Sequence, residues 1–238
     1  MNTNSNAYTL TFAVIMVTVV AGLLAFTATS LKPLQDENVR NEKMQSILST
    51  IGVDESRENA GNVYSDFIKQ ELTLKSDGTI DENPVVKAFN INLKNEIKKD
   101  PDEQRYPIYL AEIDGKTTYV IPLHGNGLWD SIWGYFAIDA DENTIVGCVF
   151  DHAAETPGLG AEIRESWFEE QYIGEQFLKT TGDFSDNSFV SVRTVKGGSK
   201  ADDKHGVDAI SGGTVTSDKL TIMVEERLRR YLPYFENN

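Results

Sequence analysis

Apolar positions along this chain fall into three patterns: one long uninterrupted stretch, pairs of alternating runs, and runs with helical spacing. The long stretch comes first, because no residue from Tyr8 to Leu31 is charged. At about 1.5 Å per residue, a helix of this length measures roughly 36 Å, enough to cross a hydrocarbon core of about 30 Å. We therefore predict one membrane-spanning helix, in an anchor over residues 1–32 that precedes a soluble domain over residues 33–238.

A cleaved signal peptide is the alternative interpretation of this apolar stretch. The small residues over 25–30 would suit a cleavage site, but no basic segment precedes the stretch, and it exceeds the usual apolar length of about 7–15 residues. The basic residues Lys32, Arg40 and Lys43 follow it, so the positive-inside rule alone would place the soluble domain in the cytoplasm.

Alternating apolar runs predict an antiparallel sheet. Strands are expected over four paired runs and one later run: 106–113, 116–123, 133–139, 144–150 and 189–195. Asp114-Gly115, between the first two runs, is a strong signal for a two-residue hairpin turn.

Helical spacing appears on both sides of these strands. Helices are expected over 36–51, near 64–72, over 85–97, over 161–179 and from Leu220 to a stop at Pro233. Runs of strands followed by helices predict an α+β fold, with an antiparallel sheet flanked by helices and preceded by the single transmembrane helix.

Composition excludes several classes of function. The formal net charge of −15 argues against nucleic acid or an anionic lipid surface as a partner. The single cysteine, Cys148, excludes an internal disulfide and a metal cluster held by cysteines of this chain alone, and its apolar surroundings suggest a buried structural thiol. The histidines His124, His152 and His205 lack ligand-like spacing, so we interpret them as structural or surface residues.

The richest candidate for chemistry is the segment over 208–217, which combines hydroxyl side chains with Gly212 and Gly213 just before the last predicted helix. A helix N-terminus can bind phosphate through its free N–H groups and the positive end of the helix dipole, and glycines let the backbone approach the anion. An ordinary helix cap, in which Thr216 or Ser217 accepts from the first turn, explains the same residues.

Two other loops and one lysine carry weaker signals. The segment 125–130 contains Gly-Asn-Gly-Leu-Trp, which lacks the third glycine of a dinucleotide-binding fingerprint, so NADH binding by this chain is not expected. Taken alone, each of two segments, 125–130 and 155–160 (Glu-Thr-Pro-Gly-Leu-Gly), is explained as a turn. Taken alone, Lys196 is explained as a solvated side chain.

Together these segments resemble a known family. Residues 208–214 are similar to the flavinylation motif Asp-x-x-Ser/Thr-Gly-Ala-Thr of bacterial respiratory flavoproteins, with Gly213 where that family usually has alanine. With the anchor, the Gly-Leu-Trp segment and the 155–160 block, the chain resembles from end to end the NqrC family of sodium-translocating NADH:quinone oxidoreductases (Nqr). The resemblance implies FMN esterified through its phosphate to a threonine, and Thr214 matches the acceptor. Thr216, two residues on, is the rival acceptor.

The same resemblance implies the rest of the site and its setting. The residues expected to contact the flavin or its phosphate are Trp129, Glu155, Thr156, Gly158, Leu159, Gly160, Lys196, Ser211, Gly212 and Gly213. The expected partners are the other Nqr subunits and a flavin transferase that uses FAD and magnesium. The expected location is the bacterial inner membrane with the soluble domain in the periplasm, against the positive-inside rule. Two alternatives stay open: the matching RnfG protein of the Rnf complex, and an anchored binding module without a cofactor.

Overall fold

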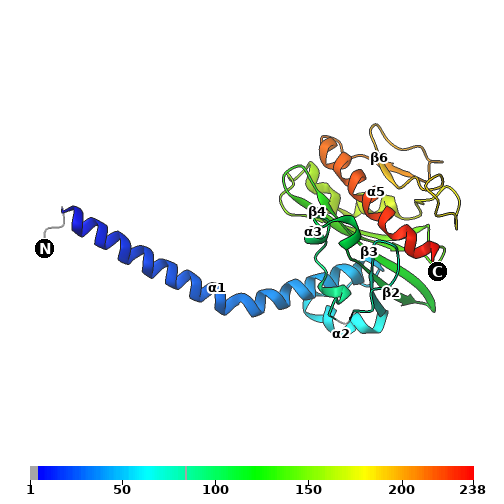
Figure 1. Ribbon diagram of the computed structural model, residues 1–238. Helices are drawn as coiled ribbons and strands as arrows, with labels where there is room; N and C mark the ends of the chain where they lie inside the picture. Colours follow the sequence, from blue (N-terminus) through cyan, green and yellow to red (C-terminus); the bar gives the residue numbers. More distant parts are fainter. Residues whose placement is uncertain (1–4, 84) are drawn as a thin grey trace. The chain divides into compact units, whose positions relative to one another are not determined.

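The structure is a computed structural model that describes residues 5–83 and 85–238 (Figure 1). Residues 1–4 of the predicted anchor lie outside the described residues. The chain divides into two units, Met1–Lys43 and Met44–Asn238. Within the first unit, the only described element is the N-terminal part of helix α1 (Asn6–Thr50).

The apolar stretch is helical, as predicted, and α1 is long and apolar enough to be a candidate membrane span. None of its most apolar window is buried within the structure. The helix does not end after the stretch, because Pro33 is accommodated inside it and the predicted helix over 36–51 is its continuation. Its last residues, from Met44 to Thr50, bury Met44, Ile47 and Leu48 in the second unit.

The second unit is built on a five-stranded antiparallel sheet in the order β1–β2–β3–β4–β5. The strands are β1 (Ile68–Leu74), β2 (Tyr106–Ile113), β3 (Lys116–Asn126), β4 (Ser131–Ile138) and β5 (Ile145–His152). The four paired runs form two hairpins, β2 with β3 and β4 with β5, as the pairing of these runs predicts. Asp114 and Gly115 have φ of 51° and 75°, the left-handed conformation that a two-residue hairpin turn needs.

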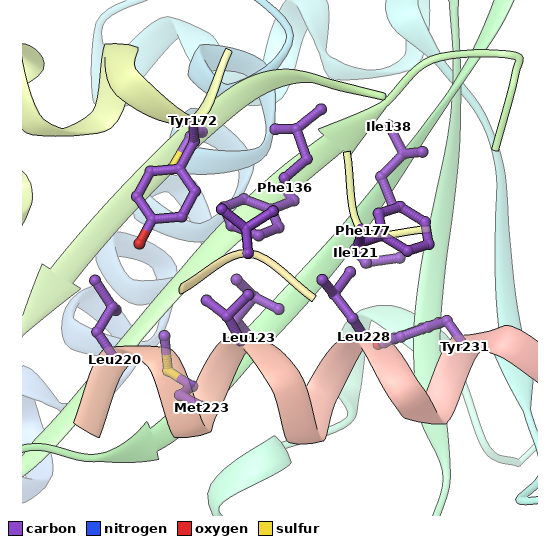
Figure 2. Close-up of a cluster of buried hydrophobic side chains, with 14 of the residues drawn as sticks. Ile121, Leu123, Phe136, Ile138, Tyr172, Phe177, Leu220, Met223, Leu228 and Tyr231 are labelled. Carbon is purple, nitrogen blue, oxygen red and sulfur yellow. The ribbon is translucent and has the colours of Figure 1, made fainter. Parts of the chain in front are cut away.

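Alternation along the strands gives the sheet two buried faces. On β3, Ile121 and Leu123 point toward helix α5 (Thr214–Glu236), whose side chains Leu220, Met223, Leu228 and Tyr231 pack against them (Figure 2). Val120, one position away, belongs to the opposite cluster with the end of α1 and with helix α2 (Arg57–Phe67). The expected α+β fold with helices flanking an antiparallel sheet is confirmed.

Several predicted elements are wrong in detail. The helix over 161–179 is instead a chain of short turns: η3 (Gly160–Arg164), α4 (Ser166–Glu169) and η4 (Glu170–Tyr172). Phe168, Tyr172 and Phe177 have a spacing that imitates a helix, but each is buried in the sheet's core from a different turn, and Gly174 at φ 91° breaks the run.

Three further boundaries differ. The helix near 64–72 ends at Phe67, where the chain enters β1, and 85–97 holds only η1 (Ala88–Asn90) and α3 (Leu93–Glu96). A further turn, η2 (Pro101–Glu103), follows α3. The strand over 189–195 shrinks to β6 (Arg193–Val195), which pairs in parallel with β7 (Gly206–Asp208).

Helix α5 passes through Pro233 instead of stopping there. A proline in a helix loses one hydrogen bond and crowds the preceding turn, so this continuation needs compensation. Leu232, Tyr234 and Phe235 around the proline are all buried in the core. Tertiary packing therefore holds the last turn where local preference would end it.

Candidate functional site

The N-terminus of α5 is the centre of the candidate site. Its N-cap is Gly213, which makes no side-chain capping bond, and Thr214 is the first helical residue and is exposed. The helix was predicted from Leu220 but begins six residues earlier, so Thr214 lies in its first turn and not in the preceding loop. The first N–H groups of a helix have no partner within it, so this end of α5 presents donors and the positive end of the helix dipole.

Neither proposed cap acts as one. Thr216 is only 1% exposed, and its Oγ1 donates to Glu155 Oε2 over 2.7 Å. Ser217 Oγ accepts from the Ile210 N–H at 3.2 Å, which folds the preceding loop back over the helix. The ordinary-cap interpretation is wrong for both hydroxyls.

Glu155 joins three segments that are far apart in the sequence. Its side chain is buried, and Oε1 accepts from the backbone N–H groups of Leu128 (2.7 Å) and Trp129 (3.1 Å), while Oε2 accepts from Thr216. Its own N–H donates to His152 Nδ1 over 3.2 Å, which fixes the loop to the end of β5. The carboxylate thereby holds the 127–130 loop, the 155–160 loop and α5 together.

Glycines leave room for this carboxylate. A Cβ on Gly127 would lie 2.3 Å from Glu155 Oε1, and a Cβ on Gly160 would lie 2.3 Å from Thr216 Oγ1 and 2.4 Å from Glu155 Oε2. Both separations are far below van der Waals contact. Gly127 and Gly160, one glycine from each of the two motifs, therefore have a packing reason at the site itself.

A hollow of about 100 Å³ lies where these segments meet. It is lined by Leu128, Glu155, Thr156, Leu159, Gly160, Gly212, Gly213, Thr214, Val215 and Thr216. Seven of these residues were predicted from the sequence. Leu128, Val215 and Thr216 were not among the predicted contacts, although Leu128 and Val215 each directly precede or follow a predicted one.

The other four predicted residues lie outside this lining. Trp129 is 68% exposed and donates from Nε1 to Thr156 Oγ1 over 3.3 Å, so it lies beside the hollow. Gly158 and Ser211 lie in the two lining loops, next to residues that do line it. Lys196 Nζ pairs with Asp218 at 3.2 Å. Asp218 is one helical turn after Thr214 and on the same face of α5.

The size of the hollow suits a phosphate and excludes a whole flavin. Its volume is that of about three water molecules, far below the roughly 300–1,000 Å³ of a pocket that encloses a drug-sized ligand. Leu128, Trp129 and Leu159 are large apolar side chains exposed around it. These residues fit a ligand whose phosphate lies inside the hollow and whose aromatic ring lies against this apolar rim.

One carboxyl and one imidazole near the sheet have shifted pKa values. Burial raises the pKa of Glu169, whose Oε1 accepts from the Phe150 N–H, to about 7. Burial, with a smaller contribution from nearby cations, lowers the pKa of His124 to about 4, so this side chain is neutral near pH 7. Across the described residues, no group of three or more histidine, cysteine or acidic side chains is arranged to hold a metal ion.

Comparison with known proteins defines the class of this site. Residues 127–229, which contain every residue that lines the hollow, match the family of FMN-binding domains. The fold and the site together define a flavoprotein domain with a shallow, phosphate-sized hollow at a helix N-terminus.

The particular family follows from relatives that span most of the chain. The NqrC protein of the Na(+)-translocating NADH-quinone reductase of Haemophilus ducreyi is 30% identical, over 91% of this chain and 87% of the relative. That of Vibrio anguillarum is 31% identical, over 87% and 84%. The crystal structure of the same protein from Parabacteroides distasonis matches with a TM-score of 0.76 and 35% identity, over 86% of this chain and 96% of that one.

The chain belongs to the NqrC family of the Na(+)-translocating NADH-quinone reductase, as the sequence resemblance implied. The structure of the Shewanella oneidensis NqrC, with a TM-score of 0.68 and 27% identity over 83% of this chain and 96% of that one, agrees with this assignment. The protein is therefore a flavin-binding subunit of that oxidoreductase and has other subunits as partners.

Proposed function

We propose that this chain carries FMN covalently, as a phosphoester on Thr214 Oγ1, and relays electrons within a sodium-pumping NADH:quinone oxidoreductase. The observation that carries the proposal is the contrast between the two threonines. Thr214 is exposed and lines the hollow, whereas the Thr216 hydroxyl is buried and donates to Glu155. Of the two hydroxyls, only that of Thr214 is accessible to an enzyme that attaches a flavin.

Attachment would exchange one phosphate bond for another. A transferase would form the bond from Thr214 Oγ1 to the FMN phosphorus of FAD, and AMP would leave as the pyrophosphate bond breaks. The hydroxyl proton would pass to a base of the transferase, because the described residues place no base on Thr214 Oγ1. When bound, FMN supplies one- and two-electron redox chemistry.

The chain's own residues would hold the cofactor and tune it. The N–H groups at the start of α5, with Ser211 and the loop amides, would bond phosphate oxygens. Trp129, Leu128 and Leu159 would cover part of the ring and exclude water from it. Lys196 pairs with Asp218, one helical turn after Thr214, and would offset the negative charge of that carboxylate near the phosphate. An exposed ring would let electrons pass to neighbouring subunits without a diffusing substrate.

The setting of the protein belongs to the same proposal. α1 would anchor the chain in the bacterial inner membrane, and the flavin domain would lie on the periplasmic side, as the family resemblance implies. The rival RnfG protein shares the flavinylation motif, but the relatives above belong to the Na(+)-translocating reductase and match over most of this chain. The match of residues 127–229 to FMN-binding domains also argues against a binding module without flavin.

Intact mass and in-gel flavin fluorescence of the denatured full chain test the proposal. The chain is co-expressed with a flavin transferase and compared with Thr214→Ala and Thr216→Ser, which keeps a hydroxyl for Glu155. The expected result is a mass increase of one FMN in the wild type and in Thr216→Ser, and none in Thr214→Ala. A flavin that persists in Thr214→Ala refutes the acceptor. A colourless wild type with an active transferase refutes the covalent flavoprotein.

A further inference from the structure

A second and larger cavity, of about 600 Å³, lies along the C-terminal half of α5. It is bounded by Ser76, Ile97, Lys99, Pro101, Gln104, Glu225, Glu226, Arg227, Arg229, Arg230 and Pro233. Glu225 is eleven positions after Thr214 on the same helix, which is about 16 Å at 1.5 Å per residue. The cavity and the candidate flavin site therefore lie toward opposite ends of α5, which runs from orange to red in Figure 1.

The lining of this cavity has the opposite charge from the rest of the chain. Four positive and two negative side chains line it, a surplus of two positive charges in a chain of net charge −15. The positive charge of this region also affects the nearby imidazole of His124. After burial, the charges of Lys94 and Arg227 are the next causes that lower the pKa of His124.

Two of the four cations are already compensated. Arg229 pairs with Asp186 at 2.5 Å and Glu225 at 3.5 Å, and it stacks over the Phe189 ring. Lys99 pairs with Glu96 at 2.6 Å. These two residues shape the cavity but have little charge left for a ligand.

The other two cations are less completely compensated. Arg227 has a side chain only 8% exposed, and its one carboxylate partner among the described residues, Glu226, is largely solvated. Its Nε and Nη1 are buried without an acceptor in the part of the chain that the structure describes. A guanidinium cannot lose its proton, so this charge stays in the wall of the cavity and favours an anion beside it. Arg230 is half-buried, and no described residue forms a hydrogen bond or an ion pair with its side chain.

We infer that this cavity binds a small oxyanion, a phosphate- or carboxylate-bearing molecule with a compact apolar part. Arg230 supplies the fork of donors that matches a phosphate or carboxylate, and Arg227 supplies charge from behind it. Ile97, Pro101 and Pro233 offer apolar wall to the rest of the molecule. The volume is that of a small-molecule pocket, which favours such a ligand over a protein segment. This site is independent of the proposed flavin attachment.

Isothermal titration of the full chain in a neutral detergent tests the inference, with inorganic pyrophosphate and citrate as separate probes. Thr214→Ala serves as the background, so that no flavin phosphate contributes. At an ionic strength of about 0.15 M, we expect one saturable site with a Kd of about 1 mM or tighter for at least one probe. The probe that binds more tightly identifies the phosphate or the carboxylate as the preferred group.

Arg230→Gln and the exposed Arg164→Gln form the matched pair of variants. We expect Arg230→Gln to weaken binding about tenfold and Arg164→Gln to leave it unchanged. Hydrogen exchange should slow only in peptides over 97–104 and 225–233 when the probe is bound. Equal effects of the two variants, protection elsewhere, or the absence of saturable binding by either probe would each overturn the inference.

Discussion

Thr216 Oγ1 donates a hydrogen bond of 2.7 Å to Glu155 Oε2, and both side chains are buried although 61 positions separate them in the sequence. This bond closes the candidate flavin site, because the same carboxylate also accepts from the backbone of the 127–130 loop. It also separates the roles of the two neighbouring threonines. Thr216 is a structural residue of the site, and the exposed Thr214 is the acceptor that we propose for the cofactor.

Glu155→Ala should destabilise the protein more than any other single change at the site. The variant leaves the N–H groups of Leu128 and Trp129 and the Thr216 hydroxyl without their acceptor. Losing the acceptor of one buried and two partly buried donors should lower the free energy of unfolding by about 3 kcal/mol. Urea unfolding of the full chain in detergent measures it, with the exposed Glu165→Gln as the control. A loss no larger than in the control would contradict the assigned role of Glu155.

Gly160→Ala should disrupt the same hydrogen bond by steric means. The added Cβ would lie within 2.4 Å of both Thr216 Oγ1 and Glu155 Oε2, so one of the two partners must move. We expect a loss of about 1–3 kcal/mol in the free energy of unfolding, and a reduced yield of attached flavin. Thr216→Ala in the same chain removes the nearest atom, so the double variant should lose less than the sum of the two single losses. Strict additivity would show that the clash is relieved elsewhere.

The sheet could be predicted because its signals are local. Alternation over 106–123 and the Asp114-Gly115 turn depend only on neighbouring residues, and both predictions are confirmed. The region 161–179 failed because the apolar spacing of Phe168 and Tyr172 fits a helix as well as the succession of turns that fills the core. Similarly, buried residues around Pro233 extend α5 beyond the point where the sequence predicts its end.

The residues of the candidate site could be predicted from the sequence, but the contacts between them could not. The family resemblance names both glycine-containing loops and Thr214, and the structure brings these segments around one hollow. Nothing local in the sequence marks Glu155 as the acceptor for two other segments, because its partners lie 26 to 61 positions away. Lys196 was also expected at the phosphate, and its observed partner is Asp218.

Trp129 should report flavin attachment by its fluorescence. Its indole is exposed and bonded to Thr156 beside the hollow, so a flavin on Thr214 would lie against it and quench its emission. We expect flavinylation to quench tryptophan emission in the wild type and to quench it much less in Trp129→Phe. Trp167→Phe is the control, because Trp167 is also an exposed indole but packs on Phe168 in α4. Equal quenching in both variants would place the flavin away from Trp129.

Glu169 should make the protein less stable as pH rises through the weakly acidic range. Burial raises its folded-state pKa to about 7 from a usual value of 4.5, and Glu165 and Asp151 add to the shift. Between these two values the folded chain keeps a proton that the unfolded chain has released, so the free energy of unfolding falls as pH increases. Glu169→Gln should remove this fall. Urea unfolding at a series of pH values measures it, and an unchanged pH profile in the variant would contradict the raised pKa.

His124 should have the opposite effect in an overlapping pH range. Its pKa is lowered from 6.5 to about 4, mainly by burial. Between pH 6.5 and pH 4, the unfolded chain therefore binds a proton at this imidazole that the folded chain does not bind. The free energy of unfolding therefore falls as pH decreases toward 4, where Glu169 contributes in the other direction. The two contributions partly cancel in the wild type, which should show a shallow pH dependence. Glu169→Gln should make the chain more sensitive to acid than the wild type, and adding His124→Gln should remove that sensitivity. If the single variant is no steeper than the wild type, His124 is protonated in the folded chain, and its burial beside Arg227 does not keep it neutral.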